Sequence, residues 1–422
     1  MRLVNTRDPR NRATFREAIQ CGMAPGGGLW VPEPVPCFRD VEALLAMGFQ
    51  ARSAEILHRF LGDEFSRAEV EEAVGSALDF PVPVVRVREG VHALELFHGP
   101  TLAFKDFGAR FLARMLALAA RGDGRRRTVL TATSGDTGAA VASAFLGLPG
   151  FQVVVLYPAG RVSPLQERQF ATLGDNVRTF AVEGSFDDCQ ALVKGAFGDA
   201  DLAARLGLTS ANSINIARLL AQVTYYFEAV ARTGEAPVIA VPSGNFGNLY
   251  AGLLAKRVGL PVKAFVVATN ANRTVPDFLE TGVYRPRASV ATLSNAMDVG
   301  APSNWERIHA LFQGDLEAMR GALRRGSLTD AGTLDSMREL HGAGYLPDPH
   351  AAVAHGVLAG NLRPGETGVF LATAHPAKFR ETLEAELGIR VPLPPALLEV
   401  RDRPVLSRSL PADAAALRAE LL

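Results

Sequence analysis

The sequence predicts an α/β protein built on mostly parallel sheets. Short, nearly continuous apolar runs alternate with amphipathic helical stretches between about residues 84 and 387, which is the pattern of repeated strand and helix units. Polar loops follow three of these apolar runs, as ligand-binding loops do in such sheets. At 422 residues the chain is too long for one ordinary domain. We expect a small N-terminal domain over residues 1–90 and two α/β domains, over 91–232 and 233–422.

The composition excludes several classes of protein. Apolar residues make up 48% of the chain and charged residues 21%, a globular balance with a formal net charge of zero. Nothing therefore indicates nucleic acid or an anionic membrane as a partner. Residues 1–7 form no apolar signal core, and no run approaches the ~20 apolar residues of a membrane span. Cys21, Cys37 and Cys189 have no metal-ligand spacing, so we expect free thiols, no metal site and a cytoplasmic protein.

The N-terminal unit combines helices with a segment of irregular backbone. Residues 24–32 are dense in Gly and Pro, which marks turns and irregular structure. Apolar residues recur at helical spacing in the stretches 15–19, 40–50 and 51–61. Residues 79–83 break that pattern and predict a linker into a strand at 84–87.

Strands and helices then alternate. Residues 106–121 predict an amphipathic helix with one apolar side, and residues 151–157 a strand covered on both faces. The other expected strands lie at 128–133, 238–241, 262–268 and 369–373. The other expected helices follow the glycine turns at 138 and 247, or lie at 163–174, 186–198, 213–232 and 376–387. Residues 270–345 contain several helical pieces, and the proline-rich tail from Val391 ends in a short helix.

One lysine stands in an apolar setting. Lys105 lies between Phe104 and Phe107, and the residues just upstream are also apolar. Lysine prefers water, and burial lowers the pKa of its amine and makes it a nucleophile. The chain has only five lysines among its 44 basic residues, at 105, 194, 256, 263 and 378. A lysine that remains in such a chain is expected to be needed for its amine. The alternative is an exposed lysine that begins a helix and pairs with Asp106, and both interpretations remain open on these residues.

The loop Ser243-Gly244-Asn245-Phe246-Gly247-Asn248 joins an expected strand to an expected helix. Its glycines allow several backbone N–H groups to point one way, and the helix N-terminus adds positive potential. Phosphate is the natural guest of such a loop. No Walker lysine follows it, which argues against a nucleoside triphosphate. The alternative is a plain glycine-rich turn.

Two further loops carry polar groups at strand ends. Ser134-Gly135-Asp136-Thr137-Gly138 offers hydroxyls and amides that could grip a carboxylate, or could cap the following helix. Thr373 ends the last expected strand, where its hydroxyl could reach a ligand. A lysine in an apolar setting, a phosphate loop and a carboxylate-binding loop together indicate pyridoxal 5'-phosphate and an amino-acid substrate.

In this combination the motifs resemble the threonine synthase family, pyridoxal-phosphate enzymes of the tryptophan-synthase-β fold. The resemblance covers nearly the whole chain. It rests on segments that occur in family order: residues 5–7, 22–32, 98–107, 134–138, 163–167, 212–215, 244–248 and 373–379. The resemblance implies two mostly parallel, three-layer domains of the tryptophan-synthase-β type plus a small N-terminal domain.

The resemblance also implies a reaction. A carbon–oxygen lyase of this family converts O-phospho-L-homoserine and water to L-threonine and phosphate, the last step of threonine biosynthesis. Phosphate leaves from Cγ, and water then adds at Cβ. The expected partner is thus a small molecule, and the enzyme is expected to be a monomer or a small homo-oligomer.

Site residues follow from the same resemblance. Lys105 would hold the cofactor and move protons, and Gly244, Asn245, Phe246, Gly247 and Asn248 would cradle the cofactor phosphate. Thr373 would face the pyridine nitrogen. Asp136 stands on the cofactor ring side, where related enzymes often have Asn, so its role is open. Ser134 and Thr137 would bind the substrate carboxylate. The substrate phosphate needs cations or hydroxyls of its own, and the candidates for it are Ser163, Arg168, Asn212 and Asn215.

Three alternatives are considered. A dehydratase-like or β-replacing enzyme of the same fold acting on serine or threonine is disfavoured by the N-terminal unit and by the segment 98–107. A non-catalytic pyridoxal-phosphate-binding relative is disfavoured by the intact Lys105. A nucleotide-binding protein would need a phosphate lysine that the loop at 243–248 lacks.

Overall fold

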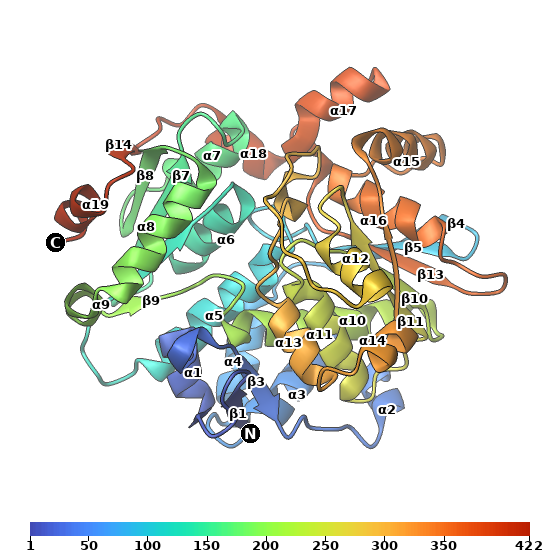
Figure 1. Ribbon diagram of the computed structural model, residues 1–422, viewed down its shortest axis with the longest axis horizontal. Coiled ribbons are helices and arrows are strands. Elements are labelled where there is room, and N and C mark those ends of the chain that lie inside the picture. The colour runs from blue at the N-terminus through green and yellow to red at the C-terminus, as the bar shows by residue number, and fades with distance from the viewer.

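The computed structural model describes all residues, 1–422. Its strands form three sheets, of three, six and five strands, with helices packed around them. Figure 1 shows the five-stranded sheet on the left, the six-stranded sheet on the right and the N-terminal domain below them. The six-stranded sheet is parallel except at β4, and the five-stranded sheet is parallel throughout. The expected α/β class is confirmed.

The N-terminal domain is a small antiparallel sheet beside four helices. The sheet has the order β2-β1-β3, with β1 at Arg2–Asn5, β2 at Arg12–Ala13 and β3 at Trp30–Glu33. The helices are α1 (Phe15–Cys21), α2 (Val41–Ala46), α3 (Phe49–Leu61) and α4 (Arg67–Ala77). The sequence predicted the first three helices. It missed these strands because two to four residues are too few to establish a period.

The six-stranded sheet has the order β12-β11-β10-β13-β5-β4. Its strands are β4 (Val84–Arg88), β5 (Val91–Glu95), β10 (Val238–Pro242), β11 (Ala264–Thr269), β12 (Leu323–Ser327) and β13 (Gly368–Ala372). The helices of this part of the chain are α11 (Gly247–Arg257), α12 (Thr274–Thr281), α13 (Trp305–Leu311), α14 (Leu316–Ala322), α15 (Asp330–Gly342) and α16 (Pro349–Ala359). β10 and β13 are buried throughout, as their apolar runs predicted.

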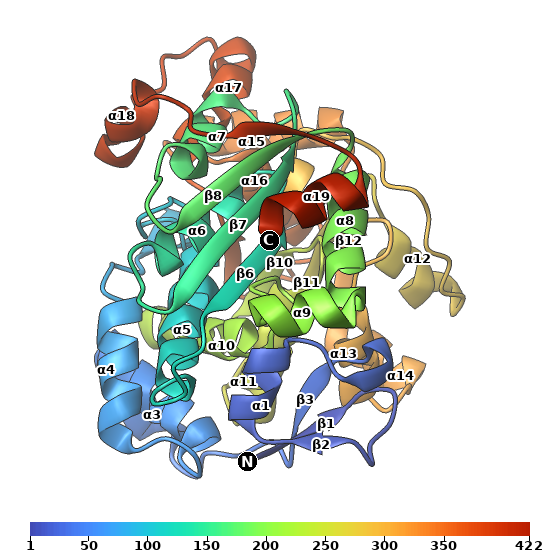
Figure 2. The same ribbon diagram turned by 90° about the vertical axis from the view of Figure 1, so that its left-hand side faces the viewer.

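The five-stranded sheet has the order β14-β8-β7-β6-β9. Its strands are β6 (Arg127–Ala132), β7 (Phe151–Pro158), β8 (Val177–Glu183), β9 (Leu208–Thr209) and β14 (Arg408–Pro411). The helices beside it are α6 (Asp136–Phe145), α7 (Pro164–Ala171), α8 (Phe186–Gly198), α9 (Ala200–Leu206) and α19 (Ala414–Leu421). In Figure 2, β8, β7 and β6 run side by side above the N-terminal domain.

The sheets cross the domain boundaries expected at residues 91 and 233. β5 pairs with β13 in register Val91 with Gly368, so the strand before Lys105 belongs to the sheet of the second half. β14 pairs with β8, so the end of the chain joins the five-stranded sheet. β4 also joins the six-stranded sheet, which places residues 84–90 outside the N-terminal domain. A single sequence does not reveal such long-range pairings, because each strand's own pattern is the same in either sheet.

Two long helices fill the centre. α5 (Lys105–Ala119) packs on α10 (Ile216–Thr233), which is buried along most of its length. A Cβ on Gly108 would lie 3.0 Å from the Arg218 carbonyl oxygen, so this glycine allows the close approach of the two helices. One hydrophobic core runs from Leu3 in the N-terminal domain to Leu371 in β13. No helix is both long enough and apolar enough to traverse a bilayer.

Candidate active site

The segment that carries Lys105 lies along the end of β13. The Phe104 N–H donates to the Thr373 carbonyl at 2.9 Å, and the His375 N–H donates to the Leu102 carbonyl at 3.0 Å. Lys105 then begins α5. The backbone just before Lys105 is thereby fixed at the carboxyl end of a buried central strand. Ligands bind at such strand ends in α/β sheets.

The Lys105 amine is in a largely desolvated setting. Only 15% of its side-chain surface is exposed, and its Nζ lies 3.4 Å from Asp136 Oδ2. Burial lowers the pKa of Lys105, and the charges of Lys378 and Arg218 lower it further. Asp136 opposes this shift without cancelling it. The amine is therefore more nucleophilic than that of an exposed lysine.

Asp106 does not pair with Lys105. Its carboxylate accepts hydrogen bonds from the Thr101 N–H at 2.9 Å and the Thr101 hydroxyl at 2.7 Å. Gly99 lies against the same carboxylate, since a Cβ there would come within 2.5 Å of Asp106 Oδ2. Burial raises the pKa of Asp106 to about 6, although the Thr101 hydrogen bonds favour the ionised form. The alternative of an exposed Lys105 paired with Asp106 is wrong, and Asp106 instead holds the turn before α5.

Asp136 is the most heavily bonded carboxylate of the site. Lys378 Nζ lies 2.6 Å from its Oδ1, and the Gln166 side-chain amide donates to the same oxygen at 3.0 Å. Burial by itself would raise the pKa of Asp136, but Lys378 and Lys105 outweigh that effect and hold it well below its usual range. Asp136 is therefore a carboxylate held between two lysines.

Lys378 and Gln166 were missed as site residues. Lys378 lies in the short 3₁₀ helix η3 (Pro376–Phe379), and its side chain is completely buried. Besides pairing with Asp136, its ammonium donates to the Thr101 carbonyl at 2.8 Å. The rarity of lysine in the chain was a usable signal for Lys378 as well as for Lys105. Gln166, in the first turn of α7, had no comparable signal.

The loop after β10 has the geometry of an anion site. The backbone N–H groups of residues 244–248 donate no hydrogen bond within the chain. They lie at the start of α11, which has no side-chain cap. A Cβ at Gly244 would lie 2.6 Å from the Ala296 carbonyl oxygen, and Phe246 has a left-handed φ of 62°. The loop is therefore held in one conformation by close backbone contacts, and its N–H groups are free to bind a phosphate.

Asn248 contributes a further free donor to this loop. Its side-chain oxygen accepts hydrogen bonds from the hydroxyls of Tyr225 and Tyr226, at 2.5 and 2.6 Å. Its side-chain nitrogen is buried and has no partner. Such an orphaned donor is costly unless a ligand satisfies it. The loop therefore fits the phosphate of a cofactor.

The loop after β6 is held by Thr133. The Thr133 hydroxyl accepts from the N–H groups of Gly135 and Gly138, at 3.0 and 2.8 Å. The N–H groups of Ser134, Asp136 and Thr137 make no hydrogen bond in the chain. Gly135 has a φ of 142°, which L side chains rarely adopt. Free donors at the start of α6 fit a carboxylate.

His375 follows Thr373 at the edge of the site. Its Nδ1 accepts from the Ala377 N–H at 3.1 Å, so it caps η3 as expected from a polar residue before this turn. Burial, followed by the charge of His98, lowers the pKa of His375 to about 4. The imidazole is therefore neutral at neutral pH and adds no positive charge beside Lys105.

The four residues suggested for a substrate phosphate occupy different settings. Ser163 caps α7 and donates to the Gln166 side-chain oxygen at 3.0 Å, which places it beside the partner of Asp136. Asn212 is half-buried and accepts from the Thr131 hydroxyl at 2.7 Å. The guanidinium of Arg168 donates to the Arg403 carbonyl in the C-terminal segment.

Asn215 has a structural role that the sequence did not reveal. It is fully buried, and its side-chain nitrogen donates to the carbonyls of Ile19 and Ser210, at 2.9 and 3.1 Å. Its side-chain oxygen accepts from the Ala217 N–H at 3.2 Å and caps α10. Since every polar atom of this amide is committed, Asn215 does not contribute to a phosphate site in this conformation. It joins α10 to the N-terminal domain.

Arg218 is a buried cation that the sequence interpretation did not consider. It is 2% exposed and forms no ion pair, although the charge of Asp106 favours its protonated form. One nitrogen donates to the Ala211 carbonyl at 2.6 Å, while Nε has no partner. Burial lowers the pKa of Arg218 to about 10. A buried guanidinium without an acidic partner is unfavourable unless an anion approaches it.

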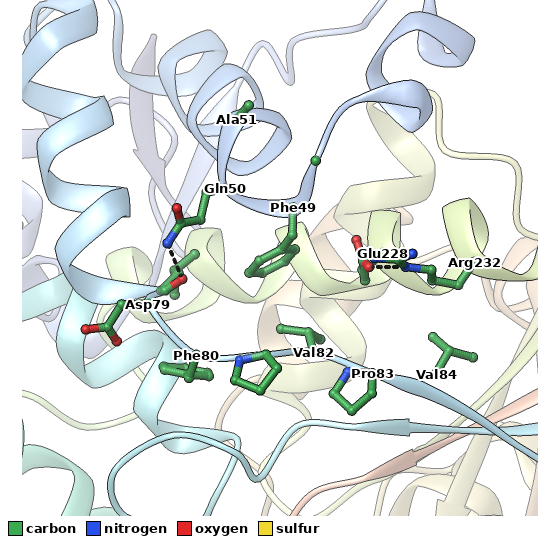
Figure 3. Close-up of a pocket in the computed structure, with 13 residues that line it drawn as sticks. Phe49, Gln50, Ala51, Asp79, Phe80, Val82, Pro83, Val84, Glu228 and Arg232 are labelled. Carbon is green, nitrogen blue, oxygen red and sulfur yellow. Dashed lines mark hydrogen bonds and ion pairs between the residues drawn. The ribbon is translucent and has the colours of Figure 1, made fainter.

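A separate surface groove of about 720 Å³ lies between the N-terminal domain and α10. Residues 48–51, residues 78–84, Glu228 and Arg232 line it, and Figure 3 shows Phe49 pointing toward the linker residues. Its lining includes neither Lys105 nor any of the three loops. The groove is therefore separate from Lys105 and from the three loops.

Comparisons with known proteins point to one family. Family models match along the chain: "Threonine synthase N terminus" at residues 2–78, "Pyridoxal-phosphate dependent enzyme" at 81–374 and "Threonine synthase, C-terminal" at 351–420. The chain is 54% identical to the threonine synthase of Escherichia coli, over 99% of this chain and 98% of that protein. It is 51% identical to the Haemophilus influenzae threonine synthase over the whole of both chains.

The chain belongs to the threonine synthase family. The crystal structure of the Escherichia coli threonine synthase superimposes with a TM-score of 0.95 at 53% identity, covering 100% of this chain and 99% of that one. A pyridoxal-phosphate-bound threonine synthase from Brucella melitensis also superimposes with a TM-score of 0.95, at 36% identity, covering 100% of this chain and 98% of that one. Maize serine racemase, at 15% identity and a TM-score of 0.56, shares the fold alone.

Family membership makes the chain a pyridoxal-phosphate-dependent lyase of threonine biosynthesis that acts on a small-molecule substrate. The geometry fits the cofactor independently of this comparison. The free N–H groups at 244–248 and the orphaned Asn248 nitrogen suit its phosphate. The desolvated Lys105 amine suits its aldehyde.

Proposed function

We propose that this threonine synthase acts on O-phospho-L-homoserine and water and releases L-threonine and phosphate, with Lys105 as the lysine that holds pyridoxal phosphate. The observation that carries the assignment of Lys105 is its largely buried amine, which lies 3.4 Å from Asp136 and follows a backbone segment bonded to the end of β13. Lys378, the other buried lysine of the site, forms a 2.6 Å ion pair with Asp136 and is less free to react.

Several residues would hold the cofactor besides Lys105. The N–H groups of Gly244, Asn245, Phe246, Gly247 and Asn248 would receive its phosphate. The Thr373 hydroxyl would serve its ring nitrogen without the charge that a carboxylate would bring. Asp136 would be an ionised acceptor for the ring. When bound, pyridoxal phosphate supplies an electron sink for a carbanion beside the substrate amino group.

The chain's own residues position the substrate and move its protons. The free N–H groups of Ser134 and Thr137, with their hydroxyls, bind the substrate carboxylate at the start of α6. The Lys105 amine would move protons at Cα and Cβ of the bound substrate. Phosphate then leaves from Cγ, and water adds at Cβ. A largely desolvated site favours these proton transfers over loss of the proton to solvent.

The substrate phosphate requires a site distinct from the loop at 244–248. Ser163 and Asn212 are hydroxyl and amide candidates beside the loop after β6, and Arg168 remains a candidate cation. Arg218 is added to this group because it is buried without a carboxylate partner and its charge acts on Lys105. A dianionic substrate would supply the partner that this guanidinium lacks.

Compartment and assembly belong to the same proposal. Cys21, Cys37 and Cys189 are all free thiols, which agrees with a reducing compartment such as the cytoplasm. The continuous core of a single chain supports a functional monomer, or a small homo-oligomer of such monomers.

Parallel assays test which compound is the substrate of this enzyme. Phosphate release and threonine formation from O-phospho-L-homoserine are measured beside ammonia release from L-threonine and L-serine. We expect the first reaction to exceed the others in kcat/KM by at least about a hundredfold, since a site built to pair with phosphate leaves buried cations unpaired with any substrate that lacks it. Equal or faster deamination of threonine would assign the chain to a dehydratase activity instead.

A further inference from the structure

Two buried lysines share the carboxylate of Asp136. Lys378 Nζ lies 2.6 Å from Oδ1, whereas Lys105 Nζ lies 3.4 Å from Oδ2. Lys378 is completely buried, while Lys105 keeps 15% of its side-chain surface exposed. The shorter and more deeply buried ion pair is thus the one with Lys378, and Coulomb attraction is strongest there.

Lys378 is held in this position by a second interaction. Its ammonium donates to the Thr101 carbonyl at 2.8 Å, and the Gln169 side-chain amide donates to the same carbonyl at 3.1 Å. Thr101 also binds Asp106 through its N–H and hydroxyl. The lysine therefore links η3 to the segment that leads into Lys105. On the other side, Gln166 orients the Asp136 carboxylate.

We propose that Lys378 is a positioning residue that takes Asp136 as its own counter-ion and so keeps the Lys105 amine uncharged and nucleophilic. This inference rests on the proposed role of Lys105 as the cofactor lysine. Without Lys378, the buried Asp136 would have only one ammonium partner, Lys105, and would favour its charged form. With Lys378 present, the carboxylate is already neutralised from the far side.

The other charged groups around Lys105 act in the same direction or are compensated. Arg218, on α10, adds a positive charge that disfavours a second cation at Lys105. Asp106, on α5 itself, is occupied by the Thr101 hydrogen bonds and its pKa is raised to about 6 by burial. His375, beside η3, is neutral at neutral pH because burial lowers its pKa. Asp136 is thus the carboxylate that most favours the charged form of Lys105, and its ion pair with Lys378 weakens that effect.

The uncharged form matters for a definite step. A neutral amine uses its nitrogen lone pair to bond to the aldehyde carbon of pyridoxal phosphate, and the aldehyde oxygen leaves as water. An ammonium has no such lone pair. The rate of cofactor capture as a function of pH therefore reports the fraction of Lys105 that is uncharged, independently of turnover.

The test uses the full-length chain, stripped of cofactor and then mixed with pyridoxal phosphate at a series of pH values, with capture followed by the visible band. Lys378→Met should need a higher pH for half-maximal capture, and an increase of one pH unit would slow capture at pH 7 about tenfold. Lys378→Arg keeps the cation and should stay close to wild type. Lys194→Met, which removes an exposed lysine on α8, is the matched control and should leave the pH profile unchanged.

A double variant separates this role from simple loss of packing. Asp136→Asn combined with Lys378→Met removes both charges, so nothing remains to hold Lys105 as an ammonium, and the profile should return to the wild-type range. If Lys378→Met fails to fold by circular dichroism, the double variant still tests the proposal, because it no longer contains the buried Asp136 carboxylate that Lys378 neutralised. A purely structural role for Lys378 predicts no such rescue.

Two results would overturn the inference. One is a Lys378→Met profile that coincides with wild type, and the other is a double variant whose half-maximal pH stays above that of wild type. Lys105→Ala distinguishes these from a failure of the proposed function. If that variant still captures the cofactor covalently, Lys105 is not the cofactor lysine, whatever Lys378 does.

Discussion

At the scale of single residues, the site is defined by how buried charges are compensated. Asp136 lies between two lysines, and Asp106 is held by one threonine. Arg218 forms no ion pair and donates to the Ala211 carbonyl instead. Lys378 already neutralises Asp136, while the buried Arg218 guanidinium forms no ion pair, which suits a substrate that brings a further anionic group.

The buried carboxyl of Asp106 should make the stability of the protein depend on pH. Because burial raises the pKa of Asp106 to about 6 from 3.8, the native state keeps its proton over a range in which the unfolded state loses it. The raised pKa of Asp106 stabilises the native state fully below pH 3.8, and this stabilisation is lost as the pH rises through 6. The free energy of unfolding, measured in urea at pH 4 to 7, should fall by about 3 kcal/mol more in wild type than in Asp106→Asn.

Asp188→Asn is the matched control for this pH dependence. Hydrogen bonds from Ser185 lower the pKa of Asp188. Any contribution of Asp188 to the free energy of unfolding should therefore increase with pH, opposite to that of Asp106. A stability difference between wild type and Asp106→Asn that stays constant from pH 4 to 7 would show that Asp106 does not titrate as described.

At the scale of elements, the loops at strand ends determine what the site binds. β10 ends in a loop with free N–H groups, β6 ends in a loop held by Thr133, and β13 ends beside the Lys105 segment. The glycines of these loops are required where backbone comes close to backbone. Gly244 is the sharpest case, because a Cβ there would meet the Ala296 carbonyl oxygen at 2.6 Å.

Gly244→Ala should therefore displace the phosphate loop. We expect the affinity for pyridoxal phosphate to fall at least about tenfold, which corresponds to about 1.4 kcal/mol. Equilibrium dialysis of the full-length protein against the cofactor measures this. Gly195→Ala on α8 is the control, since a Cβ there meets nothing within 4 Å and should leave affinity unchanged. Wild-type affinity in Gly244→Ala would remove the loop from the cofactor site.

The sequence predicted elements and sites wherever the signal was local. β6, β7, β10, β11 and β13 were predicted because each is a continuous apolar run, and Lys105 because its neighbours in sequence are also apolar. β14 was missed because four residues acquire a strand only by pairing with β8. Lys378 was missed because its partner Asp136 lies far away in the chain. The hydrogen bond of Asn215 to Ile19 was not foreseen, because Ile19 belongs to the N-terminal domain and lies far away in the chain.

At the scale of the whole molecule, the three sheets share one interior. The main core includes residues of the N-terminal domain, α5, α10 and β13. Arg307, on α13, ties distant segments together by donating to the carbonyls of Trp30 at 3.0 Å and Ile214 at 2.5 Å. A buried ion pair between Arg52 and Glu228 joins α3 to α10. The N-terminal domain is therefore integrated with the catalytic part.

This integration predicts a single cooperative unfolding transition. The two tryptophans report on different parts, since Trp30 lies in β3 and Trp305 in α13, and both are buried. Trp30→Phe and Trp305→Phe each leave one fluorescent reporter. In urea, each reporter should give the same midpoint as circular dichroism of the same variant. An N-terminal reporter that changes well before the circular dichroism signal would show that the domain unfolds independently.

The most direct measurement of the central claim is the position of the covalently bound cofactor. The holoenzyme is reduced with borohydride, digested and mapped by mass spectrometry. The added mass of the reduced cofactor should lie on the peptide that contains Lys105, with Lys378 unmodified in the same digest. Cofactor found on Lys378, or on no lysine in a protein that makes threonine, would contradict the account.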